Sequence, residues 1–80
     1  MEINLLVSSF VRQIPKEIPW SLEDKETHFV LEFTNPSEKI ERYFKKYYLP
    51  NSSEIHIFNN DYQKLIDLSL TLRRFCLDTH

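Results

Sequence analysis

The chain has 80 residues, with ten basic and twelve acidic side chains and no glycine. Only about 60% of the unfolded surface can be buried at this length, so we expect a single domain over residues 1–80 with a thin core. The net charge of −2 argues against a general nucleic-acid binder. Phosphate-binding loops and strained nucleophile turns depend on glycine, so its absence and the small size predict that the protein is not an enzyme.

Two strands and a loop are expected in the N-terminal part of the chain. Residues 3–13 predict a strand, with one apolar face formed by Ile3, Leu5, Val7 and Val11. Two prolines make residues 14–20 a stiff loop that cannot continue a sheet, and the acidic residues 23–26 are expected in solvent. Residues 27–33 alternate between apolar and polar side chains and predict a half-buried strand. A helix starting at Ser21 is the alternative, but the aromatic and β-branched alternation favours the strand.

The second half predicts a helix, a strand and a longer helix. Asn35 as a cap and Pro36 at the first helical position start a helix that runs to about Tyr48 and ends before Pro50. The residues that face inward at helical spacing are Ile40, Phe44 and Tyr47. The elements that follow are a turn at 51–53, a strand at 54–58, and a helix capped by 59–61 that reaches about Leu77.

These elements predict an α+β protein. We expect a small two-layer sandwich with both helices on one face of a three-stranded mixed sheet, in the order β-β-α-β-α. The second and third strands are joined through a helix and are therefore expected to be parallel. The first strand is expected to be antiparallel to the second and, as the longest, to lie in the middle of the sheet.

The last helix has more apolar surface than one sheet needs. A continuous stripe is formed by Leu65, Leu68, Leu72, Phe75 and Cys76, and Tyr62, Ile66, Leu70 and Leu77 widen it. The apolar arc then covers roughly 220° of the helix. One interpretation is that the helix at 36–48 packs against the extra flank. The other is that Ile66, Leu70, Arg73 and Leu77 meet a partner or a second copy of the chain.

The loop before the second predicted strand carries two further binding candidates. Ile18 and Trp20 flank a proline and could anchor a partner, because a stiff loop loses little entropy on binding. In the alternative interpretation, Trp20 closes the open end of the core. Glu23, Asp24 and Glu26 form an acidic patch that could imitate phosphates and steer the protein to a basic groove, or simply keep the loop in solvent.

Two polar groups of residues suggest other chemistry. Lys39, Arg42 and Lys46 lie near tyrosines on one helix and could contact phosphates and bases. Favourable spacings of Glu38 to Arg42 and of Glu41 to Lys45 instead predict a salt-bridged, solvated face. The side chains on the polar sides of two strands, His28, Glu32, Glu54 and His56, could bind zinc or share a proton, but a solvated sheet face gives the same pattern. We predict no metal and no cofactor.

The compartment is inferred from what the chain lacks. The first seven residues carry no basic region, and no apolar run approaches the length that spans a membrane, so we expect a cytoplasmic protein. Asn51-Ser52-Ser53 fits a glycosylation sequon but is interpreted as a turn. The single Cys76 excludes an internal disulfide and is interpreted as a packing residue.

These observations favour a small non-catalytic protein that binds a larger protein or ribonucleoprotein and inhibits or regulates it by occlusion. Immunity proteins, antitoxins and phage-encoded inhibitors such as anti-CRISPR-like proteins have this size and act by this logic; the comparison rests on no sequence motif. The alternatives are a nucleic-acid-binding regulator that uses the helix at 36–48 and a homodimeric assembly module that uses the last helix. A metal-dependent enzyme on the outer sheet face is a further alternative.

Overall fold

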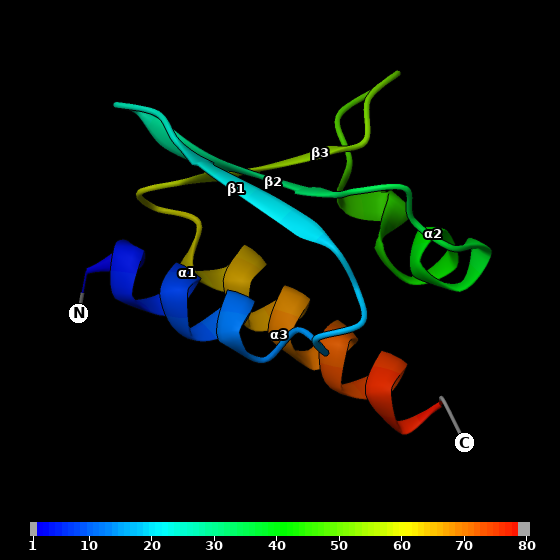
Figure 1. Ribbon diagram of the computed structural model, residues 1–80. Coiled ribbons are helices and arrows are strands. Elements are labelled where there is room, and N and C mark those ends of the chain that lie inside the picture. Colours follow the sequence, from blue (N-terminus) through cyan, green and yellow to red (C-terminus); the bar gives the residue numbers. More distant parts are fainter. Residues whose placement is uncertain (1, 79–80) are drawn as a thin grey trace.

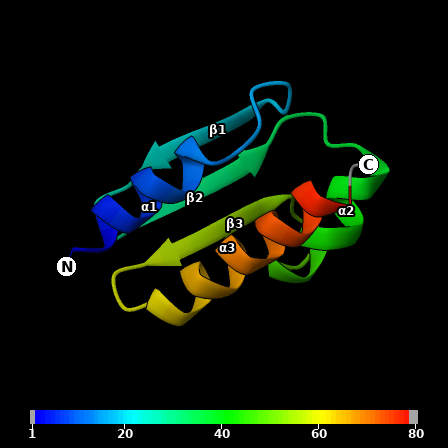
Figure 2. The ribbon, with the colours of Figure 1, turned by 90° about the horizontal axis from the view of Figure 1, so that it is seen from below.

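The computed structural model describes residues 2–78, which form three helices and a three-stranded sheet. In chain order the elements are α1 (Ile3–Arg12), β1 (Trp20–Asp24), β2 (His28–Phe33), α2 (Glu38–Phe44), a 3-10 helix η1 (Lys45–Tyr47), β3 (Glu54–Phe58) and α3 (Tyr62–Leu77). The predicted α+β class and the order β-β-α-β-α are confirmed, with an additional helix at the N-terminus. Figures 1 and 2 show α1 and α3 side by side beneath one face of the sheet, with α1 under β1 and β2 and α3 under β3.

The prediction of a strand at residues 3–13 is wrong, because this segment is the helix α1. Its buried residues are Ile3, Val7, Phe10 and Val11, and Ile14 continues the series beyond the helix. Ile3, Val7 and Val11 are four residues apart, and Phe10 and Ile14 each follow one of these positions by three residues, which is the spacing of one helix face. Leu5, which the strand prediction placed on the apolar face, is 58% exposed.

The first strand of the sheet is β1, formed by residues that were expected to lie in a loop or, alternatively, to begin a helix at Ser21. It pairs with β2 through a tight hairpin in which Lys25 and His28 exchange backbone hydrogen bonds of 2.9 and 3.3 Å. Glu26 and Thr27 form the turn without a glycine. β1 lies at the edge of the sheet, where charged side chains reach solvent and protect the exposed backbone from pairing with other chains.

The sheet is antiparallel throughout, with the strand order β1-β2-β3. The predicted parallel pairing of the second and third strands is therefore wrong, and the middle strand is β2 rather than the first strand of the chain. α2 has only seven residues, about 10 Å of helix, so it does not carry the chain back along the sheet. It lies near the end where β2 finishes and β3 begins, and the chain re-enters the sheet at that end (Figure 1).

The core lies between the sheet and the helices. Its most deeply buried side chains come from every layer: Val7, Phe10, Leu31, Phe44, Ile55, Ile57 and Leu68. α2 joins this core through Ile40 and Phe44, as the helical spacing predicted. Its cap is Ser37, whose hydroxyl accepts a hydrogen bond from the Ile40 amide at 3.2 Å, and not the predicted Asn35. No helix within residues 2–78 has the length and hydropathy needed to cross a bilayer.

Candidate binding surface

α3 carries apolar side chains on two opposite sides. Leu65, Leu68, Leu72 and Phe75 are buried against the sheet and the other helices, as predicted. On the side away from the core, Ile66, Leu70 and Leu77 are 52%, 43% and 66% exposed. Arg73 is also exposed. The interpretation that the helix at 36–48 covers this flank is wrong, because α2 and η1 contact α3 through Phe75 and Thr71 instead.

A groove separates α1 from α3. It has a volume of about 330 Å³, and α1 contributes Leu6, Ser9, Phe10 and Gln13 while α3 contributes Tyr62, Leu65, Ile66, Ser69, Leu70 and Arg73. The two helices run in the same direction, so the groove has Tyr62 and Leu6 at one end and Arg73 and Gln13 at the other (Figures 1 and 2). Serines on both helices leave space between them, and apolar side chains line most of the groove.

An acidic hollow adjoins the groove. This second cavity, of about 440 Å³, is lined by Glu2, Asp24, Lys25 and Glu26 together with Ile3, Asn4, His28, Phe29, Asn59 and Tyr62. Its three carboxylates and one ammonium group give a net charge of −2 when His28 is neutral. Tyr62 lines both cavities, so they form one surface. Tyr62 and Arg73 are about 16 Å apart along α3, so this surface runs from an acidic end, through an apolar middle, to a cationic end.

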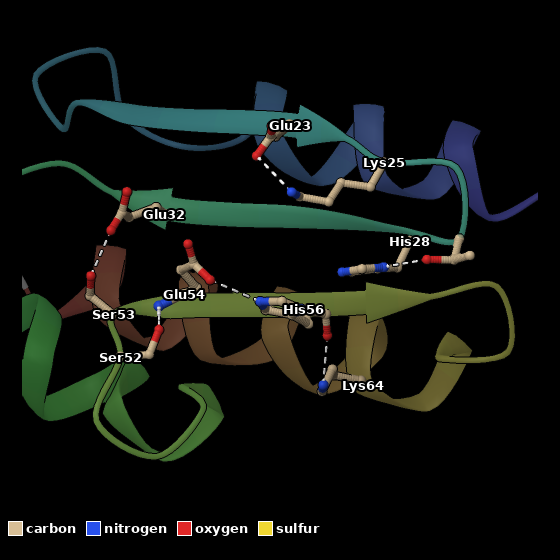
Figure 3. Close-up of polar contacts among 10 residues, drawn as sticks. Glu23, Lys25, His28, Glu32, Ser52, Ser53, Glu54, His56 and Lys64 are labelled. Carbon is tan, nitrogen blue, oxygen red and sulfur yellow. Dashed lines mark hydrogen bonds and ion pairs between the residues drawn. The ribbon is translucent and has the colours of Figure 1, made fainter.

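The structure divides the predicted acidic patch. Asp24 and Glu26 line the acidic hollow, whereas Glu23 lies on the open face of the sheet. There the Glu23 carboxylate pairs with Lys25 Nζ at 3.6 Å, and both side chains are largely exposed (Figure 3). An exposed pair of this kind contributes little to stability.

Ile18 and Trp20 do not line either cavity. Ile18 is half-buried and packs against the core. Trp20 begins β1 opposite Phe33 and is 38% exposed, at the other end of the strand from Asp24. The two loop residues are therefore separate from the surface that joins the acidic hollow to α3.

The basic side chains of α2 and η1 do not form a common outward face. Lys39 Nζ donates to the Phe75 carbonyl at 3.4 Å and lies 4.8 Å from the centre of the Phe75 ring. Lys46 Nζ lies 5.3 Å from the centre of the Tyr47 ring, and Arg42 is exposed. In the described part of the chain, the expected ion pairs from Glu38 to Arg42 and from Glu41 to Lys45 are not formed. Only part of this basic set is thus available to phosphates.

The open face of the sheet brings the two predicted histidines together. The ring centre of His28 lies 4.8 Å from that of His56 and 4.5 Å from that of Phe58, and His28 stacks on both rings. Figure 3 shows His28 and His56 side by side. Val30, the one apolar residue expected on the polar side of its strand, is directly opposite His56 and only 5% exposed. Val30 is therefore buried among the side chains of the open face, beside the stacked rings, although no helix covers this face.

The carboxylates of Glu32 and Glu54 on this face contact neighbouring side chains. Glu54 Oε1 lies 3.0 Å from His56 Nε2, and Glu32 accepts a hydrogen bond of 2.7 Å from the Ser53 hydroxyl (Figure 3). His28 Nδ1 lies 2.8 Å from the Thr27 hydroxyl. Among residues 2–78, no group of three or more His, Cys, Asp or Glu side chains is arranged to hold a metal ion. These residues are therefore near neighbours, as expected, but do not converge on one point.

Sequence reasoning missed the contribution of α1 to the groove. Leu6, Ser9 and Gln13 were assigned to a strand, so their position beside α3 was not foreseen. The signal in the sequence is the apolar character of Phe10 and Ile14, which lie three residues after Val7 and Val11 and so extend a helical spacing. Cys76 is half-buried and packs against the core, as its interpretation as a packing residue requires.

Comparison with known proteins gives no relative from which a site could be transferred. No protein-family model matches the chain, and neither the curated proteins nor the solved structures contain a match.

Proposed function

We propose that this protein is a small non-catalytic binding protein that docks on a larger protein and inhibits or regulates it by occlusion. The observation that carries the proposal is the continuous surface formed by the acidic hollow and the groove between α1 and α3. Exposed apolar side chains rimmed by charged ones are typical of protein interfaces. A cytoplasmic setting, and a role like that of immunity proteins, antitoxins or anti-defence inhibitors, belong to the same proposal.

The surface supplies two different contributions to binding. Asp24, Glu26 and Glu2 give the acidic end a field that attracts a basic partner and speeds association. Ile66 and Leu6 line the apolar middle, where a partner's side chains would be removed from water. Arg73 offers a guanidinium group at the far end, where a partner's carboxylate would bind. The expected partner therefore presents a basic region, an apolar segment and an acidic group in that order.

The nucleic-acid alternative has weaker support. Lys39, one of its three cations, is directed to the carbonyl and ring of Phe75. The acidic hollow would repel a phosphate backbone. A homodimer through α3 competes with the partner for the same surface, because it would also use Ile66 and Arg73, and its observations are given in the next subsection.

Affinity capture from cells of the source organism tests the proposal with matched variants. Ile66→Asp places a charge in the groove at an exposed position and should abolish capture of a stoichiometric partner, while circular dichroism shows an intact fold. Leu5→Asp is the control, because Leu5 is 58% exposed but lines neither cavity. Reversal of Asp24 and Glu26 to lysine should slow association and reduce its dependence on salt. Equal capture by wild type and Ile66→Asp, or recovery only of nucleic acid that salt removes, would contradict the proposal.

A further inference from the structure

The exposed side of α3 is a ridge with Leu70 at its crest. At 100° per residue, the residues opposite the core stripe are Gln63, Ile66, Leu70 and Leu77. Leu70 lines the groove toward α1 and also a third cavity of about 420 Å³, toward α2 and η1, which is lined by Lys46, Tyr47, Asp67, Thr71 and Arg74. A helix with apolar stripes on opposite sides is normally covered on both.

The charged residues of the ridge are arranged around Leu70. Asp67 lies three residues before it, and Arg73 and Arg74 lie three and four residues after it. Asp67 and Arg74 are on the flank toward α2, since both line the third cavity. Ile66 and Arg73 are on the flank toward α1, since both line the groove. On the flank toward α2, the acidic Asp67 precedes Leu70 and the basic Arg74 follows it. On the flank toward α1, the apolar Ile66 precedes Leu70 and Arg73, with its aliphatic stem, follows it.

We infer that α3 packs antiparallel against α3 of a second copy of this chain, across a two-fold axis that passes between the two Leu70 side chains. Such an axis reverses the helix direction but keeps each flank on its own side. Asp67 therefore faces Arg74 of the second copy, and the symmetry repeats this pair. On the other flank, Ile66 packs against the aliphatic stem of Arg73 of the second copy.

Charge complementarity selects this occupant and this direction. In a parallel pair the two-fold axis runs along the helices and exchanges the flanks, so Arg74 would face Arg73 of the second copy and Asp67 would face Ile66. The like charges of the two arginines make that arrangement unfavourable. Within residues 2–78, Asp67 accepts only a hydrogen bond of 3.2 Å from Gln63 Nε2, and neither Arg73 nor Arg74 has an ion pair. Both partners of the proposed ion pair are thus available. The inference does not depend on the proposed function, since it needs no other protein.

Sedimentation equilibrium of the purified 80-residue chain tests the inference by exchanging the charges of Asp67 and Arg74. Wild type should be a dimer. Asp67→Arg and Arg74→Asp each replace two attractive contacts by two repulsive ones and should weaken dimerisation about tenfold. An equimolar mixture of the two variants restores both attractions and should dimerise about as strongly as wild type. Leu70→Asp should give a monomer, and the control Leu5→Asp a dimer.

Two results would overturn the inference: a wild type that stays monomeric up to about 1 mM, or a mixture that dimerises no better than the single variants. A monomeric wild type that still captures a partner through Ile66 would overturn the dimer and leave the proposed function standing. If the wild type is a dimer, the mixed variants restore dimerisation and no partner is captured, the dimer stands and the proposed function is contradicted.

Discussion

The hydroxyl groups of Tyr47 and Thr71 lie 2.8 Å apart and connect η1 to α3. Thr71 is 3% exposed and is the only buried polar residue within residues 2–78. It lies one position after Leu70, on the side of α3 that faces α2 and η1. The bond therefore satisfies a polar group in the core, on the same side of α3 as the buried Leu68 and Phe75 and away from the exposed Leu70.

The first prediction concerns this bond. Thr71→Val keeps the shape of the side chain but leaves the Tyr47 hydroxyl without its partner, so the free energy of unfolding should fall by about 1–2 kcal/mol. Tyr47→Phe should also destabilise the protein. The double variant should cost less than the sum of the two, because no unsatisfied hydroxyl remains. Urea denaturation of the four proteins measures this coupling, and additive effects would show that the two hydroxyls do not interact.

The second prediction concerns backbone conformation in a chain without glycine. Asn51 has a φ of 60° in the turn before β3. Asparagine tolerates this left-handed conformation better than most residues, but glycine has no steric cost there. Asn51→Ala should therefore lower the free energy of unfolding by about 1 kcal/mol, and Asn51→Gly should leave it unchanged or raise it.

Asn60→Ala is the matched control for this second prediction. Asn60 is also an exposed asparagine in a turn, but its φ is not positive. Thermal unfolding should rank Asn51→Ala clearly below Asn60→Ala. If both alanine variants lose the same stability, the left-handed conformation is not the reason that asparagine occupies position 51.

Several elements could be predicted because their signals are local. The alternation of apolar side chains in β2 and the spacing of Ile40 and Phe44 in α2 each agree with a single type of structure. The core stripe of α3 and the position of Ile66 and Leu70 on another side of the helix follow from helical geometry, whereas the exposure of these two side chains needed the structure. The α3 side of the candidate surface was therefore one of the two interpretations that the sequence left open.

The N-terminal third could not be predicted, because its patterns were ambiguous. Ile3, Val7 and Val11 are separated by four residues, which fits one face of a strand and one face of a helix equally well. Only Phe10 and Ile14 distinguish the two, and their burial depends on tertiary packing. β1 is an edge strand rich in charge, and its hairpin turn contains no glycine. The groove depends on α1 and the acidic hollow on β1, so both needed the structure.

The last prediction concerns Tyr48, which follows η1. Burial of the phenol, together with the nearby carboxylates of Glu41 and Glu32, raises the pKa of Tyr48 to about 12. In the unfolded chain its pKa is about 10. Below pH 10 both states hold the proton, so Tyr48 contributes no pH dependence there. Between about pH 10 and 12 the unfolded state releases the proton more readily, so stability should fall as the pH rises through this window.

Tyr48→Phe removes this titration and should make the fall in stability between pH 10 and 12 shallower than in wild type. Urea denaturation of both proteins at several pH values measures the difference, and other alkaline titrations cancel because they occur in both. Ultraviolet titration of tyrosinate gives an independent readout: the variant should lack the step near pH 12. Identical pH profiles would mean that the Tyr48 phenol is as well solvated in the folded chain as in the unfolded one, and that the carboxylates of Glu41 and Glu32 do not influence it.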